Sequence, residues 1–309
     1  MPTLLYTHPS FGKHEVPPGH AEHSGRYAAV DKALQAEIFA DLVRRTPPRA
    51  TQEQIERVHP ARFREAVEAT APTQGLAQFD ADTFAGPSSL DAALRAAGGA
   101  VAAVDANYNG EAKNAFIAAR PPGHHAEPQR AMGFCLFNSA AIAAMHARAV
   151  HGARRVAVVD FDVHHGNGTE AAFWDDEHAF YASSHEHPQY PGTGRASDRG
   201  AYDNIANAQL ATGEGSSAFR RAWDEQLLPA LAEFAPDFIV ISVGFDAHRA
   251  DPLGGLALTE DDFTWVTAQI AAIARDKAQG RLISLLEGGY DLPALASSTA
   301  AHVKALMEV

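Results

Sequence analysis

Short apolar runs alternate with alanine-rich stretches along most of this 309-residue chain. The apolar runs favour buried strands and the alanine-rich stretches favour helices, an order typical of βα units that build a largely parallel sheet. Two helix starts carry capping-box residues, Ser88 with Asp91 and Thr259 with Asp262. The predicted strands are Thr3–Tyr6, Ala115–Ala118, Arg155–Val159, Ala179–Ala182, Phe238–Val243 and Leu282–Leu286. The predicted helices are Gly25–Val43, Ser89–Ala106, Ala140–Ala149, Ser217–Phe234 and Glu260–Ala278.

Length and composition narrow the class of protein further. The chain has no internal repeat and no linker rich in Pro, Gly or Ser, so we expect a single domain over residues 1–309. Its one cysteine, Cys135, excludes an internal disulfide. The net charge of −13 argues against a general nucleic-acid-binding protein and mildly favours cationic partners, but plain solubility is the preferred explanation of this charge. Because the first residues lack a signal-peptide pattern and no apolar run reaches about 18 residues, we expect a cytoplasmic protein without a membrane span.

Ionisable and amide side chains follow five of the predicted strands at the point where each strand ends. Because ligands bind at the carboxyl ends of the strands in an open parallel sheet, we expect these residues to meet at one edge. Each group alone is ambiguous, but neither solubility nor core packing explains why all of them share this position. In chain order the groups are His124 and His125; Asp160, Asp162, His164, His165 and Asn167; Ser183, Ser184 and His185; Asp246 and His248; and Glu287 and Tyr290.

Asp162 and His164 are separated by one residue, which places their side chains on the same side of an extended segment. A carboxylate and an imidazole so arranged can bind one cation, and Asp246, which follows another predicted strand, is the candidate third ligand. Two carboxylates, one imidazole and an open position are typical of a catalytic Zn²⁺ or Fe²⁺ site. The alternative is a surface aspartate beside a loop histidine, but the neighbouring Asp160 and the glycine-rich segment that follows favour the metal site.

Two adjacent histidines, His124 and His125, follow the rigid segment Pro121–Gly123. Adjacent side chains diverge on a regular element, so only a constrained loop can bring both rings to one site. Two imidazoles near a metal site indicate general acid–base chemistry, and Asp160 and Asn167 are candidate acceptors for their second ring nitrogens. The alternatives are a second metal site or a hydrogen-bonded core histidine. One metal is favoured because no further aspartate on the loop after Asp160 is placed to bridge two metals.

Other residues near the expected edge are ambiguous on their own. In the segment Gly288–Tyr290, two glycines let the backbone approach a ligand closely, and the tyrosine hydroxyl can donate to a developing oxyanion. Taken alone, this segment reads as a turn followed by a packed aromatic side chain. Cys135 is expected to be a small buried thiol rather than a nucleophile, because a metal-activated water makes a covalent step unnecessary. Phe134 and Tyr190 fit either an apolar channel or the protein core.

Longer strings around these residues resemble the arginase–deacetylase superfamily, and within it the bacterial histone-deacetylase-like amidohydrolases of the class II type. The strings cover most of the chain and are highly specific in combination. The resemblance implies a three-layer α/β/α fold with an eight-stranded, mainly parallel sheet. One departure is Ala21, where the family often has proline. The matching strings are GHAEHSGR (19–26), DTFAGPSS (82–89), RPPGHHAEPQRAMGFCLFNSAAIAA (120–144), VVDFDVHHGNGTE (158–170), YPGTG (190–194), GFDAHRADPLGG (244–255) and LEGGYD (286–291).

The resemblance also implies roles for the clustered residues. The implied ligands of Zn²⁺, with Fe²⁺ as the alternative metal in the cell, are Asp162, His164 and Asp246. The implied catalytic set is His124, His125, Asp160, Asn167 and Tyr290. In that set His125 looks like the general base and acid, oriented by Asn167, and His124 looks like its electrostatic neighbour, oriented by Asp160. Tyr290 would polarise the amide carbonyl and stabilise the oxyanion.

A potassium site and a substrate tunnel complete what the resemblance implies. The expected potassium ligands are Asp160, Asp162, His164, Ser183 and Ser184. Phe134 and Tyr190 resemble tunnel walls, and Leu253 resembles a rim residue. Asp82 matches a position that holds the substrate backbone, and Arg26 resembles an arginine behind the site that guides released acetate. The remaining expected tunnel residues are Gly133 and Gly289.

These observations predict a zinc-dependent deacylase that hydrolyses N-acetyl or N-acyl amides of lysine-like amines through a metal-activated water. The expected substrate is an acylated small amine or an acetyl-lysine peptide or protein, and the sequence leaves a homo-oligomer open. An acetylpolyamine amidohydrolase is the nearest alternative, although Leu253 is apolar and the segment 185–194 is short. An arginase-like binuclear ureohydrolase would need bridging aspartates. An acyl-lysine-binding module without catalysis would lack a ligand or the tyrosine.

Overall fold

The computed structural model describes residues 1–309 and contains an eight-stranded sheet whose neighbouring strands all run parallel. The order across the sheet is β2-β1-β5-β10-β9-β6-β7-β8. The strands are β1 Thr3–Tyr6, β2 Val43–Arg45, β5 Asn114–Ile117, β6 Val156–Asp160, β7 Ala179–Glu186, β8 Ile205–Leu210, β9 Phe238–Val243 and β10 Leu282–Leu286. A short antiparallel pair, β3 Ala77–Gln78 and β4 Phe84–Ala85, lies outside this sheet.

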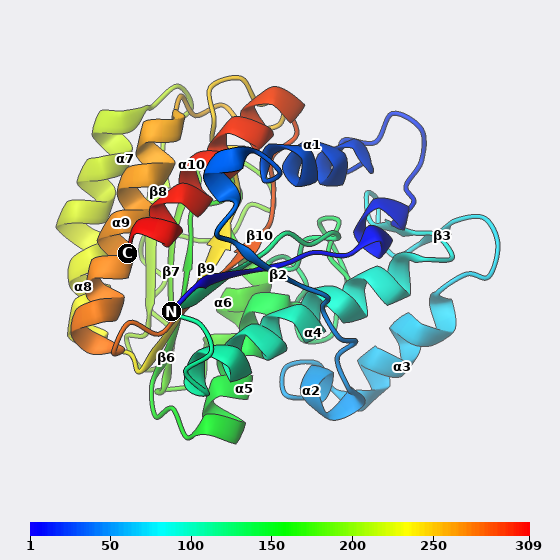
Figure 1. Cartoon of the computed structure of the whole chain (residues 1–309), viewed down its shortest axis with the longest axis horizontal. Helices are drawn as coiled ribbons and strands as arrows, with labels where there is room; N and C mark the ends of the chain where they lie inside the picture. Colours follow the sequence, from blue (N-terminus) through cyan, green and yellow to red (C-terminus); the bar gives the residue numbers. More distant parts are fainter.

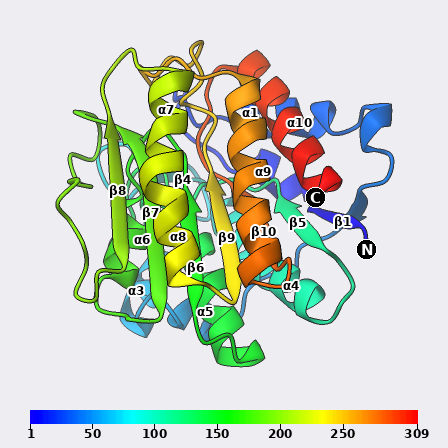
Figure 2. The same ribbon diagram turned by 90° about the vertical axis from the view of Figure 1, so that its left-hand side faces the viewer.

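Helices cover both faces of the sheet (Figures 1 and 2). One face of the sheet packs against α1 and against the helices α7 to α10. The other face packs against α4, α5 and α6. Helix α3 lies against the outer side of α4. A π-helical turn, Trp223–Leu227, joins α7 to α8. The α-helices are α1 Gly25–Ala33, α2 Gln52–Glu56, α3 Ala61–Thr70, α4 Ser89–Tyr108, α5 Ser139–His151, α6 Asn167–Phe173, α7 Ser216–Ala222, α8 Leu228–Phe234, α9 Glu260–Lys277 and α10 Leu292–Glu308. This arrangement confirms the predicted α/β/α architecture.

The central strands β6, β9 and β10 are mostly apolar because both of their faces are buried. In β6, Val159 packs into the core beneath α7 to α10, whereas its neighbour Val158 packs into the core beneath α4 and α5. In β9, Ile241 and Val240 divide in the same way. Alternation of side chains across a strand therefore fills two cores at once, as expected for a parallel sheet covered by helices.

The edges of the sheet differ from the sequence prediction more than its centre does. The bounds predicted for β1, β9 and β10 are confirmed, and β5, β6 and β7 are displaced or extended by a few residues. The prediction missed both edge strands, β2 and β8, and the C-terminal helix α10. Edge strands are paired on one side only, so their sequences carry less of the apolar pattern that marks a buried strand. In β2, the sequence VRR is largely exposed.

One predicted helix and one predicted cap are wrong. The helix expected over Gly25–Val43 ends at Ala33, and the chain then passes through a short 3₁₀ turn into β2. The capping box of Thr259 and Asp262 is present, but Ser88 makes no side-chain cap bond. Asp91 instead accepts hydrogen bonds from two arginine side chains, which compete for the carboxylate that the cap would need.

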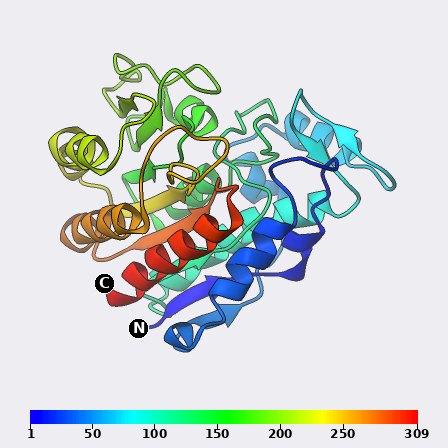
Figure 3. The same cartoon turned by 90° about the horizontal axis from the view of Figure 1, so that it is seen from above.

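The carboxyl ends of β10, β9, β6 and β7 lie side by side because these strands are neighbours in the sheet. The arrowheads of β8 and β9 point to the top of Figure 2, and Figure 3 views the molecule from that side. Loops from distant parts of the chain gather there, and they carry the predicted site. No helix is both long enough and apolar enough to cross a membrane.

Candidate active site

Three buried side chains from two neighbouring strands converge beyond the carboxyl ends of β6 and β9. Asp162 and His164 lie in the loop after β6, and Asp246 follows β9. Nδ1 of His164 is 3.0 Å from Oδ1 of Asp162 and 3.2 Å from Oδ2 of Asp246. One ligand atom from each residue lies within 4.8 Å of the others. The structure thus brings together the three metal ligands expected from the sequence, here termed the Asp162 cluster.

Hydrogen bonding and charge in the Asp162 cluster leave a place for a cation. Oδ2 of Asp246 is buried, and apart from its 3.2 Å contact with Nδ1 of His164 it has no polar partner. Burial, together with the charge of Asp162, raises the pKa of Asp246 to about 7. Burial would also raise the pKa of Asp162, but His124 and His164 outweigh it and lower that pKa. A divalent cation relieves the repulsion between the two carboxylates, and two carboxylates with one imidazole fit Zn²⁺ or Fe²⁺.

His124 and His125 reach the same site from the loop after β5, with ring centroids 4.0 Å apart. Nδ1 of His124 lies 2.9 Å from Oδ2 of Asp160, and Nδ1 of His125 lies 2.8 Å from Oδ1 of Asn167. The amide nitrogen of Asn167 donates to Glu127 at 2.8 Å, so its oxygen is directed toward His125. Nδ1 of a neutral His125 therefore carries the proton, and Nε2 is the free acceptor.

The two rings of the histidine pair differ in charge. Burial lowers the pKa of a histidine, but Asp160 and Asp162 outweigh it and raise the pKa of His124 to about 10. Burial holds the pKa of His125 well below its ordinary value, and the neighbouring His124 and His164 lower it further. A neutral imidazole beside a charged one is suited to accept a proton. His125 thus has the hydrogen bonding and the direction of pKa shift that a base needs, and its role as the base stays a prediction.

Tyr290 follows a tight backbone passage after β10. The N–H of Gly288 donates to Oδ2 of Asp162 at 2.8 Å, and a Cβ at Gly288 would lie 2.0 Å from Oδ2 of Asp246. Only glycine lets the chain pass the metal ligands this closely. Asp251 then fixes the backbone beyond the glycines, because its Oδ2 accepts the N–H of Tyr290 at 2.6 Å.

A cavity of about 230 Å³ gives access to the histidines and to the tyrosine. Two of its lining residues, Asp82 and Leu253, match the expected substrate-holding and rim positions. Gly289 was expected among the tunnel residues but does not line the cavity; Gly288 does. The carbonyl oxygen of Gly289 instead accepts a hydrogen bond from Arg26. The lining residues are Asp82, Pro122, His124, His125, Gly133, Phe134, His164, Gln189, Tyr190, Leu253, Gly288 and Tyr290.

Two aromatic residues form apolar walls of this cavity. The ring of Phe134 packs edge-to-face against Tyr290 at 5.9 Å, and the ring of Tyr190 packs edge-to-face against His125 at 5.1 Å. Phe134 has a φ of 68°, a left-handed backbone conformation that is unfavourable for a residue with a side chain. Strain of this kind concentrates at functional sites, where the surrounding structure imposes it. Both residues expected as tunnel walls line this cavity, and their role toward a substrate stays a prediction.

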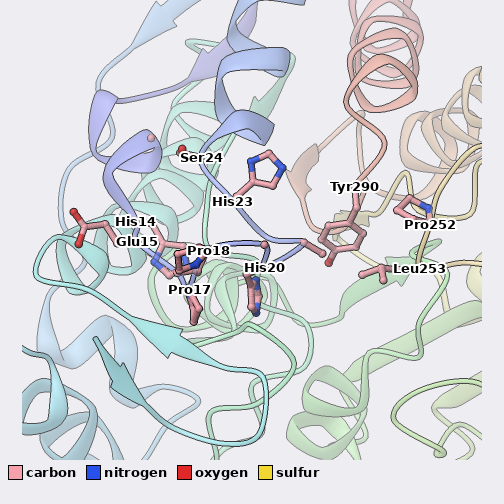
Figure 4. A pocket seen from close by; sticks show the side chains of 14 residues that line it. His14, Glu15, Pro17, Pro18, His20, His23, Ser24, Pro252, Leu253 and Tyr290 are labelled. Carbon is pink, nitrogen blue, oxygen red and sulfur yellow. The ribbon is translucent and has the colours of Figure 1, made fainter. Parts of the chain in front are cut away.

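A second cavity, of about 740 Å³, shares Tyr290 and Leu253 with the first. Figure 4 shows Tyr290, Leu253 and Pro252 on one side of this cavity and His14 and Pro17 on the other. The remaining lining comes from the segment between residues 12 and 24, which precedes α1. The Tyr290 ring is therefore a wall common to both cavities.

Arg26 is fully buried behind Tyr290, with its guanidinium carbon 4.9 Å from the centre of the tyrosine ring. Its Nε donates to the carbonyl of Gly289 at 2.6 Å, and its Nη1 pairs with Glu22 at 2.9 Å. Burial would raise the pKa of Glu22, but Arg120 outweighs it and lowers that pKa. Arg26 is thus held between a carboxylate and the backbone that leads to Tyr290. Its expected role toward released acetate stays a prediction.

The potassium site expected from the sequence stays a prediction, and its two serines differ in the contacts of their hydroxyl groups. Oγ of Ser183 lies 2.9 Å from Nδ1 of His185, whereas Oγ of Ser184 accepts from Nε1 of Trp223 at 3.0 Å. Successive side chains of β7 point to opposite faces of the sheet, so of the two serines only Ser183 can offer its hydroxyl to the expected site, and Ser184 would contribute its backbone carbonyl. Ser183 pairs in register with Asp160, so its hydroxyl is the one that remains available to such a site.

Several buried groups near the site carry no role in the sequence prediction. Glu287 is the clearest, because its Oε2 accepts the N–H groups of Gly123 at 2.6 Å and His124 at 3.1 Å. Glu287 stands among the residues that follow a predicted strand, but no sequence pattern shows which backbone N–H a carboxylate accepts. Cys135, in contrast, is buried as expected, and burial raises the pKa of its thiol well above the ordinary value, which keeps it protonated.

A second group of metal-binding residue types lies between α4 and α5 and is termed the Asp105 cluster: Asp105, His146 and His151. Oδ1 of Asp105 lies 2.8 Å from Nε2 of His146 and 2.7 Å from Nε2 of His151. Nη1 of Arg57 lies 2.8 Å from Nδ1 of His146. The ring of Tyr108 stacks on His151 at 4.5 Å. This cluster was not predicted from the sequence, because it depends on how two helices pack.

Comparison with known proteins relates the chain to deacetylases. Residues 20–306 match the histone deacetylase domain. A histone deacetylase-like amidohydrolase of Pseudomonas aeruginosa is 41% identical over 88% of this chain and 73% of its own length. A probable deacetylase of Archaeoglobus fulgidus is 36% identical over 94% of this chain and 82% of its own length. An uncharacterized protein of Synechocystis is 37% identical over 99% of this chain and its own full length.

The structural comparison agrees with the sequence matches. The crystal structure of the HDA15 HD domain superimposes with a TM-score of 0.93 at 33% identity, covering 99% of this chain and 88% of that one. The matched family region includes every residue of the Asp162 cluster, the histidine pair and Tyr290. These findings confirm the resemblance predicted from the sequence strings. The chain belongs to the histone deacetylase family.

Proposed function

We propose that this chain is a zinc-dependent deacylase that hydrolyses N-acetyl or N-acyl amides of lysine-like amines, as a single catalytic domain over residues 1–309. The observation that carries the proposal is that one cavity is lined by a ligand of the Asp162 cluster, by the neutral His125 and by Tyr290. These are the three kinds of group that amide hydrolysis at a metal requires: a cation site, a base and an oxyanion donor.

Each group of the chain has a defined task in this proposal. Bound to the Asp162 cluster, Zn²⁺ would supply Lewis acidity, which polarises a carbonyl and makes water easier to deprotonate. Nε2 of His125 accepts a proton from the attacking water and later delivers it to the leaving amine. The hydroxyl of Tyr290 donates to the carbonyl oxygen as that oxygen becomes negative. His124 stays protonated beside Asp160 and keeps the pKa of His125 low.

The shape of the cavity supports an acyl-aminoalkyl substrate. Phe134 and Tyr190 provide apolar walls, which favour the uncharged methylene chain of an acylated amine. A volume of about 230 Å³ accommodates a short chain and an acyl group, and the remainder of a peptide stays outside. An acetyl-lysine side chain has this form.

A specific observation favours a second candidate, an acetylpolyamine amidohydrolase. Asp82 lines the cavity, and Oδ1 of Asp80 accepts its N–H at 3.1 Å, so two carboxyl groups lie close together near the entrance. Burial and the neighbouring Asp80 raise the pKa of Asp82. A cationic amine near this pair would stabilise the ionised form of Asp82, which favours a substrate with a positively charged tail.

A deacylation panel with metal analysis tests the proposal. The purified chain, loaded with zinc, is assayed on acetyl-lysine peptides of several acyl lengths and on acetylputrescine. We expect turnover of acylated amines, loss of turnover on chelation and recovery when zinc is restored. Faster turnover of acetylputrescine than of acetyl-lysine peptides would favour the second candidate. Zinc-loaded protein that hydrolyses none of these substrates, or turnover that survives complete removal of the metal, would refute the proposed function.

A further inference from the structure

Glu287 is a buried carboxylate beside the histidine pair that takes no part in the chemistry proposed above. Glu287 is the residue directly after β10, and it is 1% exposed. Burial raises its pKa to about 7, because the surroundings do not fully compensate the charged form. A buried carboxyl group is unfavourable for stability compared with an apolar side chain of similar size. Its presence at this position therefore calls for a physical reason.

The contacts of Glu287 on one side are with the loop that carries the histidines. Its Oε2 accepts two consecutive backbone N–H groups, from Gly123 at 2.6 Å and from His124 at 3.1 Å. A Cβ at Gly123 would lie 2.9 Å from the carbonyl oxygen of Phe137, so this loop is already pressed against the neighbouring backbone. The carboxylate thus holds the loop by its backbone at Gly123 and at His124, the residue whose ring enters the site.

The contacts of Glu287 on the other side are with the elements that carry the metal ligands and the tyrosine. Its Oε1 accepts the hydroxyl of Ser242 at 3.1 Å, and its N–H donates to the carbonyl of Val243 at 2.8 Å; both residues belong to β9, which leads to Asp246. The next residue, Gly288, bonds to Asp162 through its N–H. One side chain therefore connects the histidine loop to the backbone that holds two of the three metal ligands.

We propose that Glu287 is a positioning residue that sets the placement of the His124–His125 pair relative to the Asp162 cluster and Tyr290. This inference rests on the proposed function, because its effect is read as a change in deacylation. The carboxylate acts through its hydrogen-bond geometry and touches neither substrate nor metal. A displacement of about 1 Å in a catalytic group can lower a rate by about 100-fold, so a single misplaced loop is enough to matter.

Three substitutions separate position from charge at Glu287. Glu287→Gln removes the charge but keeps an oxygen that can accept both N–H groups, and the Ser242 hydroxyl can turn to accept from the new amide. Glu287→Asp keeps the charge but withdraws the oxygens by one methylene. Glu287→Leu removes both. If position is what matters, kcat should be near wild type for Gln, about tenfold lower for Asp and about 100-fold lower for Leu, with KM and zinc content nearly unchanged.

Asp262 supplies a matched control. It is buried and, like Glu287, accepts a backbone N–H and a serine hydroxyl, from Thr259 at 3.0 Å and Ser216 at 2.6 Å, but it lies on α9. Asp262→Leu should lower stability while kcat stays at the wild-type value. If Glu287→Leu does not fold, the Gln and Asp variants decide the matter. Wild-type kcat in Glu287→Asp, or a lower kcat in Gln than in Asp, would overturn the proposal, as would an equal loss of kcat in Asp262→Leu.

A spectroscopic readout separates failure of this inference from failure of the proposed function. Backbone ¹H–¹⁵N resonances of Gly123 and His124, and the imidazole resonances of His125, should shift in Glu287→Asp and stay in place in Asp262→Leu. If the wild-type protein hydrolyses no acylated amine but Glu287→Asp still shows these shifts relative to it, the proposed function is refuted and the positioning role is kept. Unshifted resonances in Glu287→Asp would refute the positioning role, whatever the wild-type activity.

Discussion

The Asp162 cluster and the Asp105 cluster contain the same kinds of residue but differ in how their bonding is satisfied. In the Asp105 cluster, one carboxylate oxygen accepts a hydrogen bond from each of two histidines, and Arg57 donates to Nδ1 of His146. His146 is therefore a neutral ring whose Nε2 carries the proton. A metal would need the lone pair of that nitrogen, so binding would break two hydrogen bonds of an already satisfied group.

In the Asp162 cluster, by contrast, hydrogen bonds within the protein do not satisfy the charged groups. This cluster holds two carboxylates and one imidazole, Oδ2 of Asp246 has no polar partner outside the cluster, and all three side chains are at most 11% exposed. In the Asp105 cluster the aspartate side chain is 42% exposed, so water can solvate it without any ion. The comparison shows that residue types and spacing alone do not define a metal site. Two buried carboxylates that share a single imidazole make the Asp162 cluster the stronger candidate of the two for a cation.

The largest expected effect is a loss of zinc and activity when one aspartate of the Asp162 cluster is removed, compared with no loss when the aspartate of the Asp105 cluster is removed. Asp246→Ala leaves two ligands in the Asp162 cluster and should abolish both zinc binding and deacylation. Asp105→Ala should keep one zinc per chain and wild-type activity. Elemental analysis of both dialysed proteins, together with the deacylation assay, checks this. The comparison fails if Asp246→Ala keeps its zinc or if the wild-type chain holds two tightly bound metals, one of which is lost in Asp105→Ala.

The second-largest effect concerns Tyr290, the proposed oxyanion donor, which lies near the Asp162 cluster and not near the Asp105 cluster. Tyr290→Phe should retain zinc and stability but lower kcat by about 10²–10³-fold, because the hydroxyl bonds most strongly to charge that develops in the transition state. KM should change much less than kcat. Steady-state kinetics on an acetyl-lysine peptide measures both. Wild-type kcat in a variant with full zinc content would remove Tyr290 from the mechanism.

The third effect is a shift in the pH dependence of kcat/KM. It tests why His125 is paired with the amide of Asn167, whereas His124 is paired with the carboxylate of Asp160. Asn167→Asp places a carboxylate behind His125, which stabilises the protonated ring and raises its pKa. The base is then free only at higher pH, so the acidic limb of kcat/KM should move upward by about 1–3 pH units. Profiles of kcat/KM against pH measure the shift.

The control for this prediction uses Glu127, which accepts a hydrogen bond from the amide of Asn167 at 2.8 Å. A carboxylate at position 167 would repel Glu127, so the substitution is also made together with Glu127→Gln, and Glu127→Gln alone is the reference. An acidic limb that stays in place or moves to lower pH in the double variant, at full zinc content, would show that His125 is not the base or that Asn167 is not its partner.

The smallest effect is on stability and should have opposite signs in the two clusters. Burial would raise the pKa of Asp105, but its hydrogen bonds from His146 and His151 outweigh burial and lower it. The ionised form therefore stabilises the fold at pH 7, and this contribution disappears as the pH falls from about 4 through the lower folded pKa. Because the side chain is partly exposed, Asp105→Asn should reduce the free energy of unfolding at pH 7 by only about 0.5–1 kcal/mol.

In metal-free protein, Asp246→Asn should change the free energy of unfolding in the opposite direction to Asp105→Asn. The pKa of Asp246 is raised in the folded chain, so its ionised form destabilises the fold at pH values above the unfolded pKa. Removing that charge should raise the free energy of unfolding at pH 7. Urea unfolding of both variants at pH 7 and near pH 3 measures these differences. Equal signs at pH 7 would contradict the distinction between a satisfied and an unsatisfied cluster.

The site was more predictable from the sequence than the edges of the fold. Asp162, His164 and Asp246 each follow a strand whose two faces are buried, so the apolar run marks the strand and the polar residue marks its end. The parallel order of the sheet then brings these ends together without further information. In β2 and β8, which lie at the sheet edges, the apolar pattern is weaker, and the prediction missed both.

Contacts between a side chain and a particular backbone group were not predictable. Glu287 is adjacent to the glycines in sequence, but its partners Gly123 and His124 lie more than 160 residues earlier in the chain. Asp251 likewise reaches the N–H of Tyr290 across 39 positions. Such bonds depend on the final placement of loops, which carry no periodicity. The helix expected to continue to Val43 failed for a related reason, because Leu42 joins the core from a non-helical segment.

The glycine at position 288 has a consequence for how this sequence can vary. Several other glycines, such as Gly110 and Gly213, have positive φ angles and open space around them, so substitution there strains the backbone but displaces nothing. At Gly288 the obstacle is different in kind, because the volume that a methyl group would occupy is already filled by carboxylate oxygens of Asp162 and Asp246. No adjustment of backbone angles removes that overlap while both ligands stay in place. A side chain at position 288 is therefore incompatible with the present placement of both carboxylates, so any substitution of this glycine also disturbs the proposed cation site.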